Sequence, residues 1–376
     1  YDKALPLFER YVKTSDTTLV RARGGYWAAR SAQLAGQREL AVQRWRETIA
    51  IEPLHWYALL SQMRLSQLGS TLPDPFDPPP APPPSAAVEP ASAPAPVVVP
   101  AVPFAPPQLT LPPEVELYSR LGLVDDAAAA MKKAEPSLRA GLSDEVASIA
   151  LCAAYQRIQE YARAYKLAAA EHSSAIRQRP LGVTRAHWDA LFPRPYLDDV
   201  QQVTQQNQLP DDFVYSIMRQ ESSYDAGVVS SANAVGLLQL IEPTARTIAS
   251  ELGITPWKKQ LLFQPAYNIR LGARYLADLL SRYHGQAVPA IAAYNAGEHR
   301  VGAWLARGEK RHAAATKSKD KRVELDRFVE DIPIEQTRNY VRRVVANWAR
   351  YRYLAHPETL WPFTLPEYLS SQPPAP

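Results

Sequence analysis

The sequence has little cysteine, no long apolar run and no histidine pair at metal-binding spacing, and each shortage excludes a class of protein. The single cysteine, Cys152, excludes an internal disulfide framework and any zinc site built from several cysteines. None of the seven histidines forms an HExxH pair, so we expect no metal and no cofactor. No apolar run approaches the roughly 18–20 residues of a membrane span, so we expect no transmembrane segment.

The sequence also lacks a large excess of charge of either sign. The 42 Lys and Arg residues against 38 Asp and Glu leave a net charge of +4. That excess is too small to argue for a nucleic-acid partner, and we expect none. The chain begins at Tyr1 without the basic and apolar regions of a signal peptide, so it reads as a mature chain or a fragment.

Proline is the residue in excess, and the excess is local. Of the 35 prolines, 17 lie within residues 71–113. A Pro/Ala-rich stretch forms neither strand ladders nor a core, so we predict an extended, polyproline-like linker there. An inert spacer is favoured over a recognition motif.

Helical patterns lie on both sides of this linker. Residues 26–36, 38–51 and 56–68 each read as a helix that stops at glycine or proline, which indicates a helical region over residues 1–70. The pattern allows either a repeat of stacked helix pairs or a plain helical region. A chain of 376 residues is long enough for further domains. The predicted division is a helical region 1–70, a linker 71–113, a second helical region 114–199 with one long helix from about Val146 to Ala170, a catalytic domain 200–360 and a tail 361–376.

A carboxylate lies on the apolar stripe of one predicted helix. The helix begins at residues 209–212, where proline and two acids mark a helix start. Val214, Ile217 and Met218 form its stripe, and Glu221 occupies the next position on it. Apolar surroundings should raise the pKa of that carboxyl group. A carboxyl protonated near neutral pH suits a general acid for glycosidic cleavage, although the stripe alone also allows a helix-end acid paired with arginine.

Short motifs of polar and small residues follow Glu221 in the C-terminal half. They occur in one order over about 130 residues, which makes the combination specific. The motifs are RQESSYD at 219–225, SSANAVGLLQL at 230–240, NI at 268–269 with LGARYL at 271–276, AAYNAG at 292–297, and IP at 332–333 with QTRNYV at 336–341.

In this order the motifs resemble those of the soluble lytic transglycosylases. The resemblance implies an all-α chain, in which a helical-repeat-like N-terminal region precedes a lysozyme-like α domain. It also implies cleavage of the β-1,4 bond between N-acetylmuramic acid and N-acetylglucosamine in peptidoglycan. No water attacks in this family, because the muramoyl C6 hydroxyl closes on its own C1 and leaves a 1,6-anhydro end. The implied location is the periplasm or cell envelope. The implied partner is the peptidoglycan glycan strand, and the helical region is a candidate surface for other cell-wall proteins.

The resemblance also assigns roles to single residues. Glu221 would protonate the glycosidic oxygen and then act as base towards the C6 hydroxyl. Tyr294 matches the active-site tyrosine of the family, and Ser230 and Gln239 match polar groups that contact the glycan. Asn295 would support the turn that precedes Gly297.

The sequence departs from the family pattern at several positions. Gln336 stands where the closing motif usually has glutamate, and Glu335 lies just before it. Either Glu335 supplies a second acid or the role at this position is purely polar. Asn233 stands where the family often has glycine, and asparagine tolerates a left-handed turn. Residues 307–322 carry a local net charge of +5, and we predict a mobile, solvated insertion, with attraction to anionic wall polymers or membrane as the alternative.

Two other functions remain open at this stage. A muramidase-type hydrolase would use the same acid with a water-activating carboxylate such as Asp225. A non-catalytic wall-binding scaffold would keep the fold, and Gln336 is the main feature in its favour.

Overall fold

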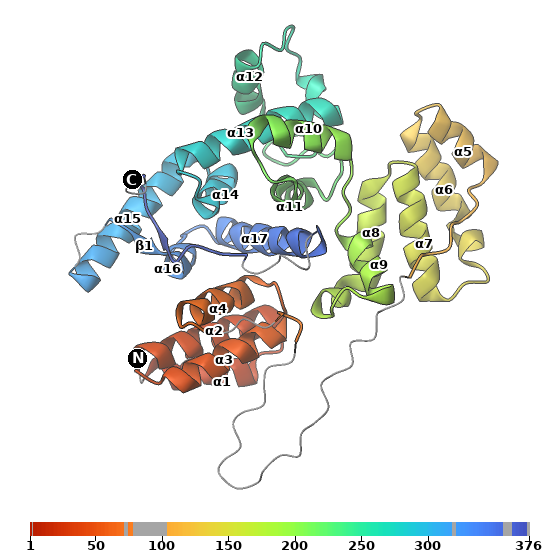
Figure 1. The fold of residues 1–376 in the computed structure, drawn as a ribbon. Coiled ribbons are helices and arrows are strands. Elements are labelled where there is room, and N and C mark those ends of the chain that lie inside the picture. Colours follow the sequence, from red (N-terminus) through yellow and green to blue (C-terminus); the bar gives the residue numbers. More distant parts are fainter. Residues whose placement is uncertain (2, 71–73, 78–103, 318–320, 356–362, 374–376) are drawn as a thin grey trace. The chain divides into compact units, whose positions relative to one another are not determined.

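The computed structural model describes residues 1, 3–70, 74–77, 104–317, 321–355 and 363–373. This part of the chain is helical almost throughout, with two strands of two residues each (Figure 1). None of its helices combines the length and the apolar character needed to cross a membrane. Most of the predicted polyproline-like linker, residues 71–73 and 78–103, lies outside the described residues.

Contacts divide the chain into two units. The first unit contains residues 1–105, 173–189 and 363–365, so residues 173–189 group with the N-terminal helices. Its elements are α1 (Ala4–Thr14), α2 (Thr18–Leu34), α3 (Arg38–Ile51), α4 (Trp56–Gln67), the 3-10 helix η1 (Ser173–Arg177) and most of α9 (Gly182–Leu191). The three helices predicted within residues 26–68 are confirmed as the C-terminal part of α2, α3 and α4.

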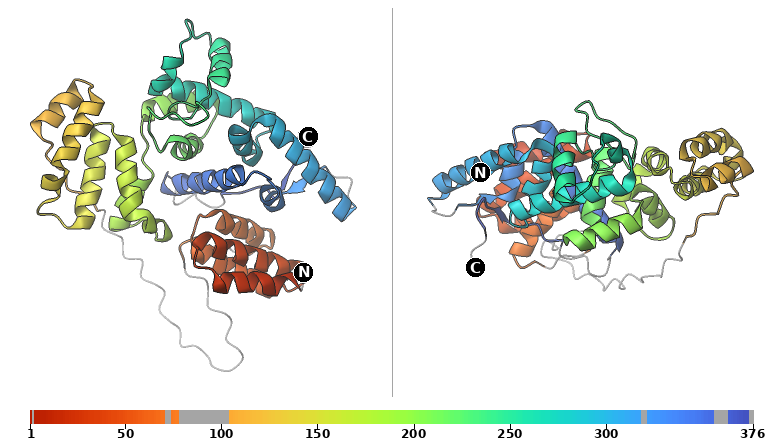
Figure 2. Two further views of the ribbon diagram at one scale, coloured as in Figure 1. Left: turned by 180° about the vertical axis from the view of Figure 1, so that it is seen from behind. Right: turned by 90° about the horizontal axis from the view of Figure 1, so that it is seen from above.

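Small residues on α2 let its neighbours approach closely. A Cβ atom added at Gly25 would lie 2.5 Å from the Thr48 hydroxyl oxygen of α3. One added at Gly24 would lie 3.1 Å from Val12 of α1. The helices α1 to α4 therefore pack against one another as a bundle, which the left view of Figure 2 shows.

Four residues of the proline-rich segment are packed within this first unit. Arg179 forms ion pairs with Asp74 at 3.2 Å and Asp77 at 2.6 Å. Between these acids, the Phe76 ring meets the Trp188 ring edge-on, with the centroids 5.9 Å apart. Residues 74–77 are thus anchored to the segment that η1 and α9 form.

The second unit begins with α5 (Pro113–Arg120), α6 (Val124–Arg139), α7 (Asp144–Arg157) and α8 (Tyr161–His172). The prediction of one long helix over residues 146–170 is wrong, because α7 and α8 are separate. Gln159 adopts φ 65°, the amide of Glu160 donates to the Tyr155 carbonyl, and the amide of Gln159 donates to the Gln156 carbonyl. This left-handed closure usually takes glycine, so glutamine at this position carries no signal that the helix stops.

The rest of the second unit surrounds the C-terminal helix α17 (Glu335–Ala355). Helices α11 and α14 pack directly against α17, and α10 packs against α13 (Figure 1). An apolar cluster that includes Val235, Ile248 and Leu271 fills the space between α12, α13 and the preceding loop. The remaining elements are α10 (Leu197–Asn207), α11 (Asp211–Ser222), α12 (Glu242–Glu251), η2 (Lys259–Phe263), α13 (Pro265–Arg282), α14 (Ala287–Ala296), α15 (Glu298–Thr316) and α16 (Leu325–Glu330).

The basic segment is mostly helix, so the prediction of a mobile loop is wrong for residues 307–316, which belong to α15. Two contacts fix this helix to neighbouring segments of the same unit. A Cβ atom added at Gly308 would lie 3.0 Å from Val323, so the helix packs closely on β1 (Val323–Glu324). The strand β1 pairs with β2 (Tyr368–Leu369), and the buried Glu309 accepts hydrogen bonds from the amide and hydroxyl of Ser371 at 2.6 and 2.8 Å.

Replacing Glu309 with alanine should lower the free energy of unfolding by about 1–2 kcal/mol, because two charge-assisted hydrogen bonds are lost. The matched control is Lys310→Ala on the exposed side of the same helix, which should change it by less than about 0.5 kcal/mol. Urea unfolding of both variants measures the difference. Equal losses in the two variants would show that Glu309 does not anchor the C-terminal segment.

Candidate active site

A cavity of about 450 Å³ in the second unit brings the sequence motifs together. Its lining comes from α11, the loop of residues 230–241, α12, α13, α14 and α17. Six of the predicted site residues line it: Glu221, Ser230, Gln239, Tyr294, Asn295 and Gln336. The seventh, Glu335, is exposed at the first position of α17 and is not among the lining residues, so its role remains a prediction.

Glu221 lies in the last turn of α11 and faces this cavity. Burial raises the pKa of its carboxyl group to about 7, against a hydrogen bond from Tyr340 that lowers it. The Tyr340 hydroxyl donates to Oε1 of Glu221 at 2.5 Å. Burial holds the pKa of Tyr340 itself well above its usual value, so this phenol keeps its proton and remains the donor. The raised pKa that the apolar stripe predicts for Glu221 is confirmed.

Arg219, the arginine of the same motif, contacts groups other than Glu221. The Arg219 guanidinium donates to the Leu191 carbonyl at 3.2 Å and to Oδ1 of Asn347 at 2.9 Å. It also lies over the rings of Tyr165 and Phe192, 4.9 and 4.5 Å from their centroids. Arg219 therefore ties α11 to its neighbours, and among the described ion pairs none involves Glu221.

The two serines after Glu221 end its helix. Ser223 and Tyr224 adopt φ angles of 53° and 66°, which stop the α-helical path. The Ser222 hydroxyl accepts the Tyr224 amide at 3.1 Å, and the Tyr224 hydroxyl hydrogen-bonds that of Tyr351 on α17 at 2.5 Å. Glu221 is consequently fixed on a helix end that is clamped to α17.

The loop opposite Glu221 is held by one buried amide side chain. Asn268 of α13 is 1% exposed and donates from Nδ2 to the carbonyls of Val235 and Leu262, at 2.9 and 2.8 Å. Its Oδ1 accepts the Leu238 amide at 2.8 Å. Gly236, at φ +79°, fits only without a side chain, since a Cβ atom would lie 2.3 Å from Nδ2 of Asn268. The Asn-Ile motif therefore fixes the Gly-Leu-Leu-Gln motif.

Gln239 and Ser230 form hydrogen bonds within the loop and also line the cavity. The Gln239 amide nitrogen donates to the carbonyls of Val228 and Gly236, at 3.1 and 2.9 Å, and its Oε1 has no hydrogen-bond donor among the described residues. The Ser230 hydroxyl accepts the Ala234 amide at 3.1 Å and keeps its own proton for donation. Asn233 adopts φ 60°, so the predicted left-handed turn is confirmed. Glycan contact by Ser230 and Gln239 remains a prediction.

The AAYNAG motif connects the loop to α17. The Tyr294 hydroxyl donates to the Leu238 carbonyl at 2.6 Å, and burial and the nearby Glu221 hold its pKa well above its usual value. Asn295 accepts the Thr337 hydroxyl at 2.8 Å, so it joins α14 to the start of α17. Gly297, at φ +86°, follows α14.

Two of these residues were not predicted in these roles from the sequence. Tyr340 reads as a core residue, yet its hydroxyl contacts the carboxyl group of Glu221. A helical signal was present, because Gln336 and Tyr340 are four residues apart and share one helix face. Thr337 has no such signal, since its partner Asn295 is 42 positions away.

Glu221 is the single carboxylic acid among the described residues that line the cavity. Asp225, the alternative water-activating group, accepts the Gly227 amide at 3.0 Å and lies 3.8 Å from the Lys166 ammonium. It does not belong to the lining. Across the described ranges, no three His, Cys, Asp or Glu side chains cluster closely enough to hold a metal ion.

The described part of the chain is an all-α protein whose sequence motifs meet at this cavity. Two solved structures share the fold: an inactive mutant of the lytic transglycosylase Slt from Pseudomonas aeruginosa, and the 70-kDa soluble lytic transglycosylase from Escherichia coli. Both have a TM-score of 0.62, at 22% and 20% identity. They cover 98% and 91% of this chain, which spans 52% of each of theirs. The predicted all-α fold is confirmed.

Sequence comparisons find a known domain and similar proteins for part of the chain. Residues 198–317 match the family described as the transglycosylase SLT domain. The chain is 37% identical over 174 residues to a putative soluble lytic murein transglycosylase of Haemophilus influenzae, and 34% identical over 170 residues to the soluble lytic murein transglycosylase of Escherichia coli K12. These matches cover 46% and 44% of this chain but only 28% and 25% of the relatives. Through this domain the predicted resemblance to the soluble lytic transglycosylases is confirmed.

The close contact between Gly236 and Asn268 predicts that one methyl group added at position 236 strongly destabilises the fold. Gly236→Ala should lower the free energy of unfolding by about 3 kcal/mol or more, since the new Cβ collides with the buried amide and the backbone is left-handed. Gly285→Ala is the control, at φ +78° with no atom within 4 Å of the new Cβ, and should cost about 1 kcal/mol. Urea unfolding curves compare them. Similar losses would mean that Asn268 does not hold the loop as tightly as the contacts imply.

Proposed function

We propose that the protein is a peptidoglycan lytic transglycosylase that cleaves the glycan strand without water and forms 1,6-anhydro ends. One observation carries this proposal: among the described residues that line the cavity there is a single carboxylic acid, and its pKa of about 7 keeps much of it protonated near neutral pH. Most glycosidases use a pair of carboxylates to cleave with water or through a covalent intermediate. One acid is sufficient when the nucleophile belongs to the substrate.

The steps balance with this one acid. The protonated Glu221 donates its proton to the glycosidic oxygen as the bond to C1 breaks, which leaves a carboxylate. The carboxylate then removes the proton of the C6 hydroxyl while O6 bonds to C1 of the same sugar. Glu221 ends protonated and is ready for another cycle, and no water is consumed.

The other lining residues support positioning. The hydrogen bond from Tyr340 stabilises the carboxylate formed in the first step. The Oε1 atom of Gln239 and the hydroxyl proton of Ser230 are matched to hydroxyl and N-acetyl groups of a sugar. Gln336 lines the cavity as a neutral amide, which favours the purely polar role for this position.

The proposed substrate sets the proposed location. Peptidoglycan lies in the periplasm and cell envelope, and a protein that cleaves it must reach that space. The helical regions are the proposed surface for other cell-wall proteins.

Replacing Glu221 with glutamine should reduce the turnover of purified sacculi by about 1000-fold or more, because glutamine cannot donate the proton. Mass spectrometry of the wild-type products should show 1,6-anhydro-muropeptides. The control is Glu251→Gln, an exposed acid at the end of α12, which should keep wild-type turnover. Products heavier by one water without anhydro ends would identify a hydrolase. Full activity in Glu221→Gln would refute the assignment of the acid.

Replacing Tyr340 with phenylalanine should move the alkaline limb of the kcat–pH profile to higher pH, by about 0.5–1 unit. The hydrogen bond from Tyr340 lowers the pKa of Glu221, so its loss raises that pKa, and the acid stays protonated to higher pH. Tyr275→Phe is the control, since Tyr275 lines the cavity but makes no described hydrogen bond to Glu221. An unchanged limb, or one that moves to lower pH, would contradict the role of this phenol.

A further inference from the structure

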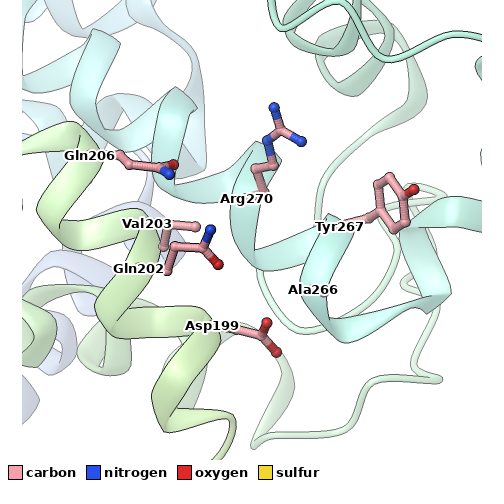
Figure 3. A pocket seen from close by; sticks show the side chains of 7 residues that line it. All are labelled: Asp199, Gln202, Val203, Gln206, Ala266, Tyr267 and Arg270. Carbon is pink, nitrogen blue, oxygen red and sulfur yellow. The ribbon is translucent and has the colours of Figure 1, made fainter.

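A second cavity, of about 310 Å³, lies between α10 and α13 of the same unit (Figure 3). We call it the α10–α13 groove. Its lining shares no residue with the catalytic cavity. The lining residues are Asp199, Gln202, Val203 and Gln206 from α10, and Ala266, Tyr267 and Arg270 from α13.

The polar side chains of this groove are not engaged within the described part of the chain. Asp199, Gln202 and Gln206 extend from α10 towards α13 (Figure 3). Neither they nor Tyr267 and Arg270 form a side-chain hydrogen bond or ion pair with a described residue. Five polar groups are thus available to a ligand in one concavity. In the catalytic cavity, by contrast, the amide nitrogen of Gln239 is already bound to two carbonyls.

The chemistry of these groups fits one class of ligand. Gln202 and Gln206 each offer a donor and an acceptor, which matches the hydroxyl and N-acetyl groups of an amino sugar. The half-buried ring of Tyr267 offers a flat apolar face to a sugar ring. Arg270 can bind a carboxylate in a bidentate geometry, and Asp199 can accept a hydrogen bond from a hydroxyl or an amine. A saccharide that carries a carboxylate uses all five groups.

We propose that the α10–α13 groove is a second glycan-binding site, which holds an N-acetylated amino-sugar unit bearing a carboxylate. The choice of this polymer rests on the proposed function, because the glycan cleaved in the catalytic cavity has units of this kind. The groove is proposed to bind a strand without cutting it, since Glu221, the proposed acid, lines the catalytic cavity and not the groove.

Helix α13 connects the two cavities. Tyr267 and Arg270 line the groove, whereas Asn268 holds the catalytic loop and Tyr275 lines the catalytic cavity. Binding at the groove therefore keeps polymer attached to the domain that cuts it. Attachment at the groove raises the effective concentration of the strand at the catalytic cavity. It therefore raises the cleavage rate of long strands and leaves that of short fragments unchanged.

Binding is tested in the Glu221→Gln protein, so that the ligand is not consumed. The probe is a GlcNAc–MurNAc tetrasaccharide with free lactyl carboxylates, titrated by calorimetry and by NMR. Two sites are expected. The triple change Gln202→Ala, Gln206→Ala and Tyr267→Ala should weaken one of them by about tenfold or more. Gln201→Ala with Gln205→Ala is the matched control, because these exposed glutamines of α10 do not line the groove. A single site, or two sites unchanged in the triple variant, would overturn the proposal.

Turnover separates this proposal from the proposed function. With Glu221 intact, the groove variant should cleave whole sacculi about threefold to tenfold more slowly and the tetrasaccharide at the wild-type rate. Circular dichroism and the urea midpoint establish that the variant is folded. An equal loss on both substrates, or no loss on sacculi, contradicts the groove. A wild-type protein without anhydro products contradicts the proposed function instead, and the number of binding sites still decides on the groove.

Discussion

The burial of one carboxyl group, that of Glu221, is the constraint on which the rest of the site depends. Water around this group would return its pKa towards 4.5, and the acid would lose its proton near neutral pH. The dry surroundings come from α11 and α17, which pack along each other, and from the loop that Asn268 holds opposite them. The motifs together serve that single electrostatic requirement, since each of them contributes to the lining of the cavity.

The sequence predicts the helices and most of the site because both depend on local signals. The stripe of Val214, Ile217 and Met218 places Glu221 on a buried face, and the raised pKa follows from that placement. What sequence reasoning misses is contact between distant segments. Tyr340 lies 119 positions from Glu221, and nothing in its own helix shows that its hydroxyl has a carboxylate as partner. Thr337 with Asn295 is the same case.

Two wrong predictions concern segments whose local sequence pattern is misleading. The break at Gln159 is a left-handed residue without glycine, so propensity alone favours a continuous helix there. The basic residues Arg307, Lys310 and Arg311 of α15 are exposed, but the segment is not a mobile loop. Gly308 packs on Val323 and Glu309 accepts two hydrogen bonds from Ser371, and neither partner can be read from the segment itself.

The side chain at position 336 affects how the pKa of Glu221 is determined. A glutamate at this position would place a second negative charge on the same cavity, and like charge raises a carboxyl pKa further. Gln336 adds no charge, so burial alone raises the pKa of Glu221 and the Tyr340 hydrogen bond alone opposes it. The protonation of the acid then depends on how completely the loop and α17 exclude water. Packing at Gly236 and Asn268 is therefore part of the chemistry, because a looser loop would admit water, lower the pKa and ionise the group that must donate the proton.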